Sequence, residues 1–411
     1  MSIYPVPELL APVGDEERLH TAIEYGADAV YLGSDRYGMR TAVATFGGDA
    51  LRNACEYAHA RGVKVYLTCN TVPRNNEIDN LPAFVEYAKD AGIDAFIVTD
   101  LGVMFTIKKH WPEAEIHIST QAGVTNYAAA TEFYNLGAKR VVTARELSLE
   151  EIAGIRAKCP KDLEIESFVH GAMCVSFSGR CLLSNYLTGR DSNRGDCAQP
   201  CRWNYAVMEE KRPGLYIPIE QDNSGTYLFN SRDMCMLEHI PELYAAGINS
   251  FKIEGRAKSA YYTAASVNAY RCAIDGFVKS GFDPLYKIPE WLRQEPIKAS
   301  NRQYCTGFYF TNPMDDANIY YDGGYVREWD VAGIVEKCED GVIYLSQRNR
   351  FFEGDELEAL IKGEKPITIT VKNLKNSKGE SVESAPNPMS SFSFDCDADI
   401  PAGAYLRKVR E

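Results

Sequence analysis

The sequence predicts an α/β protein whose larger, N-terminal domain is a (β/α)8 barrel of the TIM type. Short apolar runs alternate with helical patterns up to about residue 256, which indicates βα units and parallel strand pairing. There are eight such runs, the number that a closed barrel requires. No G-x-G-x-x-G motif follows an early run, so an open, doubly wound sheet that binds a dinucleotide is only the second choice.

The expected strands are short and rich in aliphatic side chains. They are Glu8–Ala11, Ala29–Leu32, Lys64–Cys69, Ala95–Val98, Glu115–Ser119, Arg140–Thr143, Glu164–Val169 and Ser250–Ile253. Segments such as EERLHTAIEYG and LPAFVEYAKDAG lie between them. These segments carry apolar residues at i, i+3 and i+4 and end in glycine, which is typical of amphipathic helices.

The pattern changes near Asn318, where short alternating segments replace the helices. DVAGIVEK, GVIYLSQ, PITITVKN and AYLRKV are expected to be strands joined by turns such as KNSKGE. We therefore expect a barrel domain over residues 1–317 and an all-β domain, a small barrel, over residues 318–411.

A long connection, about residues 170–249, separates the seventh and eighth strands and is much longer than an ordinary βα loop. It carries Cys174, Cys181, Cys197, Cys201 and Cys235, the first four in the spacing C-x6-C-x15-C-x3-C. Polar residues and glycines surround these thiols, so a hydrophobic core is not expected there. Clustered thiolates usually hold a metal or a cluster. Because βα loops form the catalytic face of a barrel, this site should lie over its mouth.

The spacing of the cysteines does not identify the metal. Structural zinc sites favour C-x2-4-C pairs, which only Cys197 and Cys201 provide, and the ferredoxin run C-x2-C-x2-C is absent. Iron–sulfur and zinc therefore both remain open at this point, and the fourth ligand is either Cys201 or Cys235.

Polar side chains follow the C-terminal ends of the expected strands, where barrel enzymes place their reactive groups. They are Asn70, Asp100, Gln121, Arg145, His170, Glu254 and Arg256. Such a mixture suits a small anionic molecule, because arginine pairs with carboxylates through two parallel hydrogen bonds. We expect Asn70, Gln121 and Arg145 to bind substrate. For any single residue, the alternative is a loop cap or a partner for a buried backbone group.

The catalytic candidates are His170, Glu254 and Arg256. His170 stands four residues before Cys174 and is an acid–base group, a neighbour of the cluster or a core histidine. Lys252 and Glu254 should face the same side of the eighth strand. Charges that point into a barrel are costly unless they are paired or functional.

The formal net charge is −13, which argues against binding nucleic acid by electrostatics alone. The basic pairs Lys108/Lys109 and Lys139/Arg140 are expected on the solvated surface. The start of the chain lacks the apolar segment of a signal peptide, and no apolar run is long enough to span a membrane. A cytoplasmic protein with reduced thiols is expected. Neither a G-x-S-x-G elbow nor an H-E-x-x-H zinc motif is present.

The segment ESFVHGAMCVSFSGRCLLS, residues 166–184, closely resembles the signature of the peptidase U32 family, the collagenase-like peptidases. ELLAPVG, GDCAQPCRW, NSRDMC, FKIEGRAKS and TGFYF resemble the same family, so the similarity extends over nearly the whole chain. The resemblance implies a barrel-type catalytic domain and a 4Fe-4S cluster. Its ligands would be Cys174, Cys181, Cys197 and Cys235, with Cys201 as the alternative to Cys235.

The resemblance also implies a function. Despite the family's name, several members act in oxygen-independent hydroxylation, and the length and late β domain of this chain look most like the branch that converts the wobble uridine of tRNA to 5-hydroxyuridine. Prephenate is implied as co-substrate, tRNA as partner, and a subunit of the same family as a second partner. Other branches modify ribosomal RNA or a quinone precursor. The competing hypotheses are a peptidase, which the family name suggests, and a cluster-bearing scaffold without activity of its own.

Overall fold

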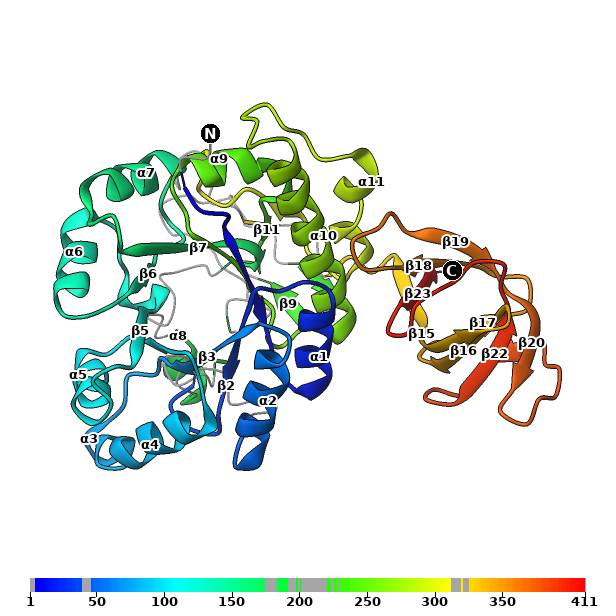
Figure 1. Ribbon diagram of the computed structural model, residues 1–411, viewed down its shortest axis with the longest axis horizontal. Coiled ribbons are helices and arrows are strands. Elements are labelled where there is room, and N and C mark those ends of the chain that lie inside the picture. Colours follow the sequence, from blue (N-terminus) through cyan, green and yellow to red (C-terminus); the bar gives the residue numbers. More distant parts are fainter. Residues whose placement is uncertain are drawn as a thin grey trace, which may run out of the picture.

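A computed structural model describes residues 4–38, 46–173, 183–190, 197–198, 200, 220–222, 225–227, 230–311, 319–320 and 325–410. Figure 1 shows a ring of strands surrounded by helices, with a smaller β domain to one side beyond α10. Within these ranges, no helix combines the length and apolar character that crossing a membrane would require.

Eight parallel strands close into a barrel, which confirms the predicted fold. They are β1 (Glu8–Pro12), β2 (Ala29–Gly33), β3 (Lys64–Cys69), β4 (Ala95–Val98), β5 (Glu115–Ile118), β6 (Arg140–Val142), β7 (Glu164–Ala172) and β12 (Ser250–Ile253). Each strand pairs with the next, and β12 pairs with both β7 and β1 to complete the ring. The expected bounds of the third, fourth and eighth strands agree with β3, β4 and β12.

Helices cover the outside of the ring. They are α1 (Glu16–Glu24), α2 (Asp49–His59), α3 (Asn75–Ile78), α4 (Leu81–Ala91), α5 (Leu101–His110), α6 (Tyr127–Asn135), α7 (Leu149–Lys158), α9 (Ile240–Ala245) and α10 (Ala260–Lys279). Local sequence sets their ends. The side chain of Ser148 accepts a hydrogen bond from the backbone of Glu151 and thereby caps α7, while α4 ends at Gly92 in the left-handed conformation. The large apolar core lies between these helices and the strands.

The long connection adds a short antiparallel extension to β7. Here β11 (Asp233–Cys235) pairs antiparallel with residues 170–172 of β7. A later strand, β13 (Tyr304–Cys305), pairs parallel with β11. Other helices and strands before the C-terminal part are α8 (Leu183–Thr188), the hairpin β8 (Glu220–Asp222) and β9 (Gly225–Tyr227), β10 (Asn230–Ser231), α11 (Glu290–Arg293) and β14 (Ile319–Tyr320).

The C-terminal part is an antiparallel all-β half-barrel, as the sequence predicts. Its main sheet contains β15 (Trp329–Glu339), β16 (Val342–Gln347), β18 (Glu356–Leu360), β19 (Ile367–Thr370), β20 (Lys372–Asn376), β22 (Ser391–Asp395) and β23 (Tyr405–Val409), and β17 (Phe351–Phe352) pairs with β21 (Ser384–Ala385). It has its own apolar core. The proposed boundary after residue 317 stays a prediction. Just beyond it, β14 pairs with β10 of the long connection.

The β domain is fixed to the barrel by buried polar contacts. Arg407 on β23 pairs with Glu295, with both carboxylate oxygens 2.8 Å from Nη2. Tyr25, which follows the last residue of α1, donates a hydrogen bond to the carbonyl of Leu360 at 3.0 Å. Leu360 and Tyr405 also belong to the apolar core of the barrel. The two domains therefore share a packed interface next to α1 and α10.

Candidate functional site

The interior of the barrel holds a buried network of charges at the amino-terminal ends of the strands. Arg140 on β6 lies 2.6 Å from Glu8, 2.6 Å from Glu164 and 3.0 Å from Glu166. The expectation that Arg140 belongs to a solvated basic pair is wrong, because only 3% of this residue is exposed. As the first residue of a short strand, it points inward to three carboxylates, which offset the cost of its desolvation.

Lys252 continues this network toward the other end of the barrel. Its ammonium lies 2.6 Å from Glu166, as well as 4.5 Å from the ring centre of Tyr31 and 5.4 Å from that of Phe168. Burial raises the pKa of the Glu166 carboxyl, but the charges of Lys252 and Arg140 outweigh this effect and lower it. The inward charge that the sequence predicts at position 252 is therefore real and paired.

Arg145 and Glu254 meet at the carboxyl ends of the strands, the mouth of the barrel. Their side chains are largely buried, and Arg145 Nη2 lies 3.6 Å from Glu254 Oε2. The guanidinium also covers the ring of Phe168, with its carbon 3.8 Å from the ring centre, and donates a hydrogen bond to the carbonyl of Ala172 at 2.8 Å. The structure thus brings together one predicted substrate-binding residue and one predicted catalytic residue.

A second pair of predicted residues lies at the ends of β3 and β5. Asn70 donates a hydrogen bond to the side chain of Gln121 at 2.8 Å. Arg256 follows β12, and its Nη1 donates a hydrogen bond to the hydroxyl of Thr68 at 3.3 Å. Gly33, the last residue of β2, lies close to the Arg256 guanidinium. A Cβ on Gly33 would meet the Arg256 guanidinium, so a larger residue there would force Arg256 to move. Amide, hydroxyl and guanidinium groups therefore line this side of the mouth.

Asp100 also belongs to the polar residues predicted at the strand ends, and its side chain caps a helix. Its side chain accepts a hydrogen bond from the backbone of Val103 at 3.0 Å and caps the start of α5. This is the ordinary role of aspartate at a helix N-terminus.

His170 occupies a different environment from the mouth residues. Its ring lies 5.8, 5.5 and 5.4 Å from the rings of Tyr262, Tyr270 and Tyr304. Burial lowers the pKa of His170 to about 4, against the opposing charge of Asp233. Its backbone pairs with Cys235 on β11, which makes it a neighbour of a predicted cluster ligand.

The predicted metal ligands are only partly within the described residues. Cys174, Cys181 and the alternative Cys201 lie outside them, and Cys197 is exposed. Within the described ranges, no three His, Cys, Asp or Glu side chains gather as a metal site would require.

The surroundings of Cys235 fit a thiolate ligand. The backbone of Leu237 hydrogen-bonds to its sulfur, and burial raises the pKa of the thiol to about 11. Backbone hydrogen bonds to sulfur are typical of cluster ligands, and a thiol with so high a pKa needs a bound cation to lose its proton.

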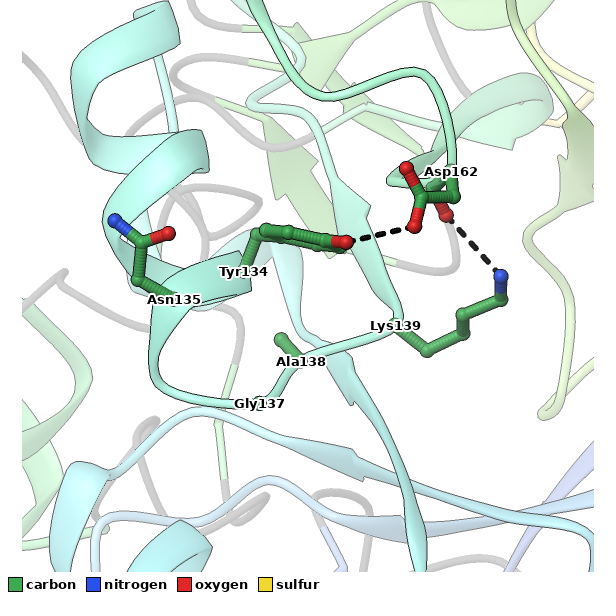
Figure 2. A pocket seen from close by; sticks show the side chains of 6 residues that line it. All are labelled: Tyr134, Asn135, Gly137, Ala138, Lys139 and Asp162. Carbon is green, nitrogen blue, oxygen red and sulfur yellow. Dashed lines mark hydrogen bonds between the residues drawn. The ribbon is translucent and has the colours of Figure 1, made fainter.

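A separate recess of about 520 Å³ lies at the opposite end of the barrel. Figure 2 shows it between the segments that precede β6 and β7, where Tyr134 donates to Asp162 at 2.7 Å and Lys139 donates to the backbone carbonyl of Asp162 at 3.1 Å. Because barrel enzymes work at the carboxyl ends of their strands, this recess is not the candidate site.

Several residues of the site were not singled out from the sequence. Tyr31, Glu166 and Phe168 all come from the middle of buried strands. The one signal available was Glu166, a carboxylate within the apolar run EIESFV. Tyr31 and Phe168 resemble ordinary core residues until the arrangement of the barrel is known.

Comparison with known proteins places the chain in a family. The model of peptidase family U32 matches residues 14–318, and that of the U32 C-terminal domain matches residues 327–407. The chain belongs to peptidase family U32.

Curated relatives of this U32 chain carry different names. It is 35% identical to tRNA hydroxylation protein P1 of Bacillus subtilis over 406 residues, 98% of this chain and 94% of the relative. It is 36% identical to tRNA hydroxylation protein P of Escherichia coli, covering 92% of this chain and 91% of the relative. It is also 34% identical to a protein named collagenase from Porphyromonas gingivalis, over 78% of each chain.

Proposed function

We propose that this chain is a tRNA-modifying enzyme that hydroxylates the wobble uridine to 5-hydroxyuridine without molecular oxygen. The observation that carries this proposal is the similarity to two tRNA hydroxylation proteins along more than nine-tenths of the chain, β domain included. Such a substrate would place the enzyme in the cytoplasm. A second subunit of the same family would be an additional partner.

Redox chemistry is assigned to a 4Fe-4S cluster held by Cys174, Cys181, Cys197 and Cys235. The environment of Cys235 supports this set, because its sulfur accepts a backbone hydrogen bond from Leu237. When bound, such a cluster supplies one-electron transfer. Cys201 remains the alternative to Cys235 as fourth ligand.

The mouth of the barrel is assigned to prephenate, a small dicarboxylate, as co-substrate. Arg145 would bind a carboxylate, and the hydrogen-bonded amides of Asn70 and Gln121 would hold polar groups of the substrate. Glu254 and Arg256 stand at the end of the same barrel and remain the catalytic candidates. His170 pairs with Cys235 through the backbone and lies among tyrosines, where burial lowers its pKa to about 4. A role as a neighbour of the cluster fits this position best.

A peptidase is the second candidate, because one relative is named collagenase. Peptidases of the serine and cysteine classes need a nucleophile that hydrogen-bonds to a base. Among the residues that the structure describes, the hydrogen bonds of histidine side chains go to Asp94, Glu115, Glu242 and Tyr304, not to a serine or cysteine. The described part of the barrel therefore favours the hydroxylation hypothesis.

The decisive experiment is mass spectrometry of tRNA nucleosides from cells with and without the gene. Loss of 5-hydroxyuridine-derived nucleosides in the deletion strain, restored by the intact gene but not by a Cys174→Ala copy, would support the proposal. Unchanged nucleosides would reject it and direct attention to ribosomal RNA, a quinone precursor or a peptide. Modified tRNA made by the purified protein alone would exclude a scaffold that depends on a partner.

A further inference from the structure

Arg145 has more hydrogen-bond donors than its surroundings use. A guanidinium carries five N–H groups. Nη1 donates to the carbonyl of Ala172, whereas the buried Nε has no hydrogen-bond partner among the described residues. Only 9% of the residue is exposed, so water does not readily compensate for the missing partner. A buried donor of this kind indicates a place for an acceptor that the described residues do not provide.

The contact between Arg145 and Glu254 is looser than its burial would lead one to expect. The side chains are 10% and 12% exposed, yet the closest approach of Nη2 to the carboxylate is 3.6 Å. Charge-assisted N–H···O hydrogen bonds are usually about 2.7–2.9 Å long. Glu254 also lies 3.5 Å from the hydroxyl of Tyr31, so its carboxylate sits between two donors without a short hydrogen bond to either. Glu254 is therefore near Arg145 but does not form short hydrogen bonds with the Nε and Nη2 edge of its guanidinium.

We propose that Glu254 is an internal competitor that a small-molecule carboxylate displaces from Arg145. This inference rests on the proposed function and identifies the group that would hold the carboxylate of its co-substrate. Nε and Nη2 lie on the same edge of the guanidinium and together form a fork for one carboxylate. Nη1, on the other side, stays bound to Ala172.

The position of this fork connects the ligand to the cysteine segment. Ala172 is the last residue of β7, and Cys174 follows two positions later in the sequence. The ring of Phe168, from the same strand, packs against the face of the guanidinium. Arg145 thus acts on the ligand directly and holds the end of β7 at the same time.

The proposal makes opposite predictions for the two members of the pair. Removing the charge of Glu254 removes a competing anion, so a carboxylate ligand should bind more tightly. If Glu254 instead held Arg145 in a productive position, the same change would weaken binding. Replacing Arg145 should weaken binding in either case, so the sign of the Glu254 effect is the decisive observation.

The test is isothermal titration of the purified full chain with prephenate at pH 7, for wild type, Arg145→Gln and Glu254→Gln. Loss of the charged fork should weaken binding about 30-fold, and Glu254→Gln should strengthen it about fivefold or more. Phenylacetate and the uncharged phenylacetamide test whether the carboxylate is what is recognised; only phenylacetate should bind. The matched control is the exposed pair Arg61 and Glu24, 3.3 Å apart, whose glutamine variants should bind prephenate like wild type.

Unchanged or weaker binding by Glu254→Gln would overturn the proposal, as would full affinity in Arg145→Gln. If Arg145→Gln does not fold, the prephenate affinity of Arg145→Lys and the sign of the affinity change in Glu254→Gln test the proposal instead. This readout needs neither RNA nor a cluster. Wild-type protein that hydroxylates tRNA but does not bind prephenate would refute the displacement while the proposed function stands. The predicted affinity pattern without any hydroxylated uridine would support the carboxylate site and refute the proposed function.

Discussion

Arg140→Met tests the charged network inside the barrel. The substitution keeps much of the side-chain volume but removes the charge that contacts Glu8, Glu164 and Glu166. Burial raises the pKa of Glu8, yet the charge and hydrogen bonds of Arg140 outweigh it and hold this pKa at about 2, below the ordinary 4.5. That difference corresponds to about 3 kcal/mol of stability at neutral pH. Breaking a buried ion pair from one side usually costs 3–5 kcal/mol. We therefore expect a loss of about 3–5 kcal/mol.

The pH dependence of this loss has a defined sign. The pKa of Glu8 is lower in the folded state, so its contribution is fully present above pH 4.5 and is lost as the pH falls toward 2. Wild type should lose about 2 kcal/mol of this contribution between pH 7 and pH 3. Without Arg140, burial raises the pKa of Glu8 and only the hydrogen bonds from Tyr66 and Ser250 oppose it, so the variant should lose most of the stabilisation that Glu8 gives at neutral pH. The difference between the two proteins should therefore shrink as the pH is lowered.

Urea unfolding followed by circular dichroism at pH 7 and pH 3 measures both effects through the midpoint of the barrel transition. The control is Arg61→Met, which removes an exposed ion pair with Glu24 and should cost less than about 1 kcal/mol. An Arg140→Met variant as stable as this control would show that the network contributes little. A deficit that grows toward pH 3 would show that the carboxylates are not the cause.

Three further predictions concern other parts of the molecule. Cys174→Ala or Cys181→Ala should remove the iron and the brown absorption of the purified protein; full iron content in either variant would exclude that residue as a ligand. Gly171→Ala should destabilise the barrel by more than about 2 kcal/mol in urea unfolding, because φ is +100° and a Cβ would meet the backbone of Glu254. Gly189→Ala, with φ +70° and open space around it, should cost only about 1 kcal/mol. Arg407→Met should cost about 3–5 kcal/mol at the interface between the domains, and a loss below 1 kcal/mol would contradict the buried pairing.

The barrel could be predicted because its strands are continuous apolar runs that alternate with amphipathic helices. Lys64–Cys69 and Ser250–Ile253 were located to the residue. The seventh strand was predicted to end at Val169 but continues to Ala172. Its last residues pair with Asp233–Cys235, about 60 positions later, and a local pattern does not reveal such a partner.

The β domain shows a different limit. β18 and β22 were not predicted, because ELEAL resembles a helical segment and SFSFD follows a turn-like sequence. PITITVKN was expected to be one strand, whereas Val371 separates β19 from β20 and donates a backbone hydrogen bond to Asp355. Pairing with distant strands, more than local preference, determines these short elements.

The site was predictable at the strand ends but not within the strands. Arg145 and Glu254 follow apolar runs, so their place at the mouth can be read from the sequence. Tyr31 and Phe168 lie in strands that are buried on both faces, where alternation does not distinguish the inside of a barrel from its helix-covered outside.

The polar interior explains how the mouth can hold Arg145, whose Nε has no hydrogen-bond partner among the described residues. Lys252 is held by Glu166, which Arg140 also binds, so the charges beneath Phe168 are fixed by partners on several strands. The ring of Phe168 lies between this network and Arg145, and it contacts both Lys252 and the Arg145 guanidinium. Such a support reduces the reorganisation that binding would otherwise require. Weakening it with Lys252→Met should therefore reduce carboxylate affinity at Arg145, although Lys252 has no direct hydrogen bond to that residue among the described contacts. Unchanged prephenate affinity in a folded Lys252→Met variant would show that Arg145 keeps its position independently of the network.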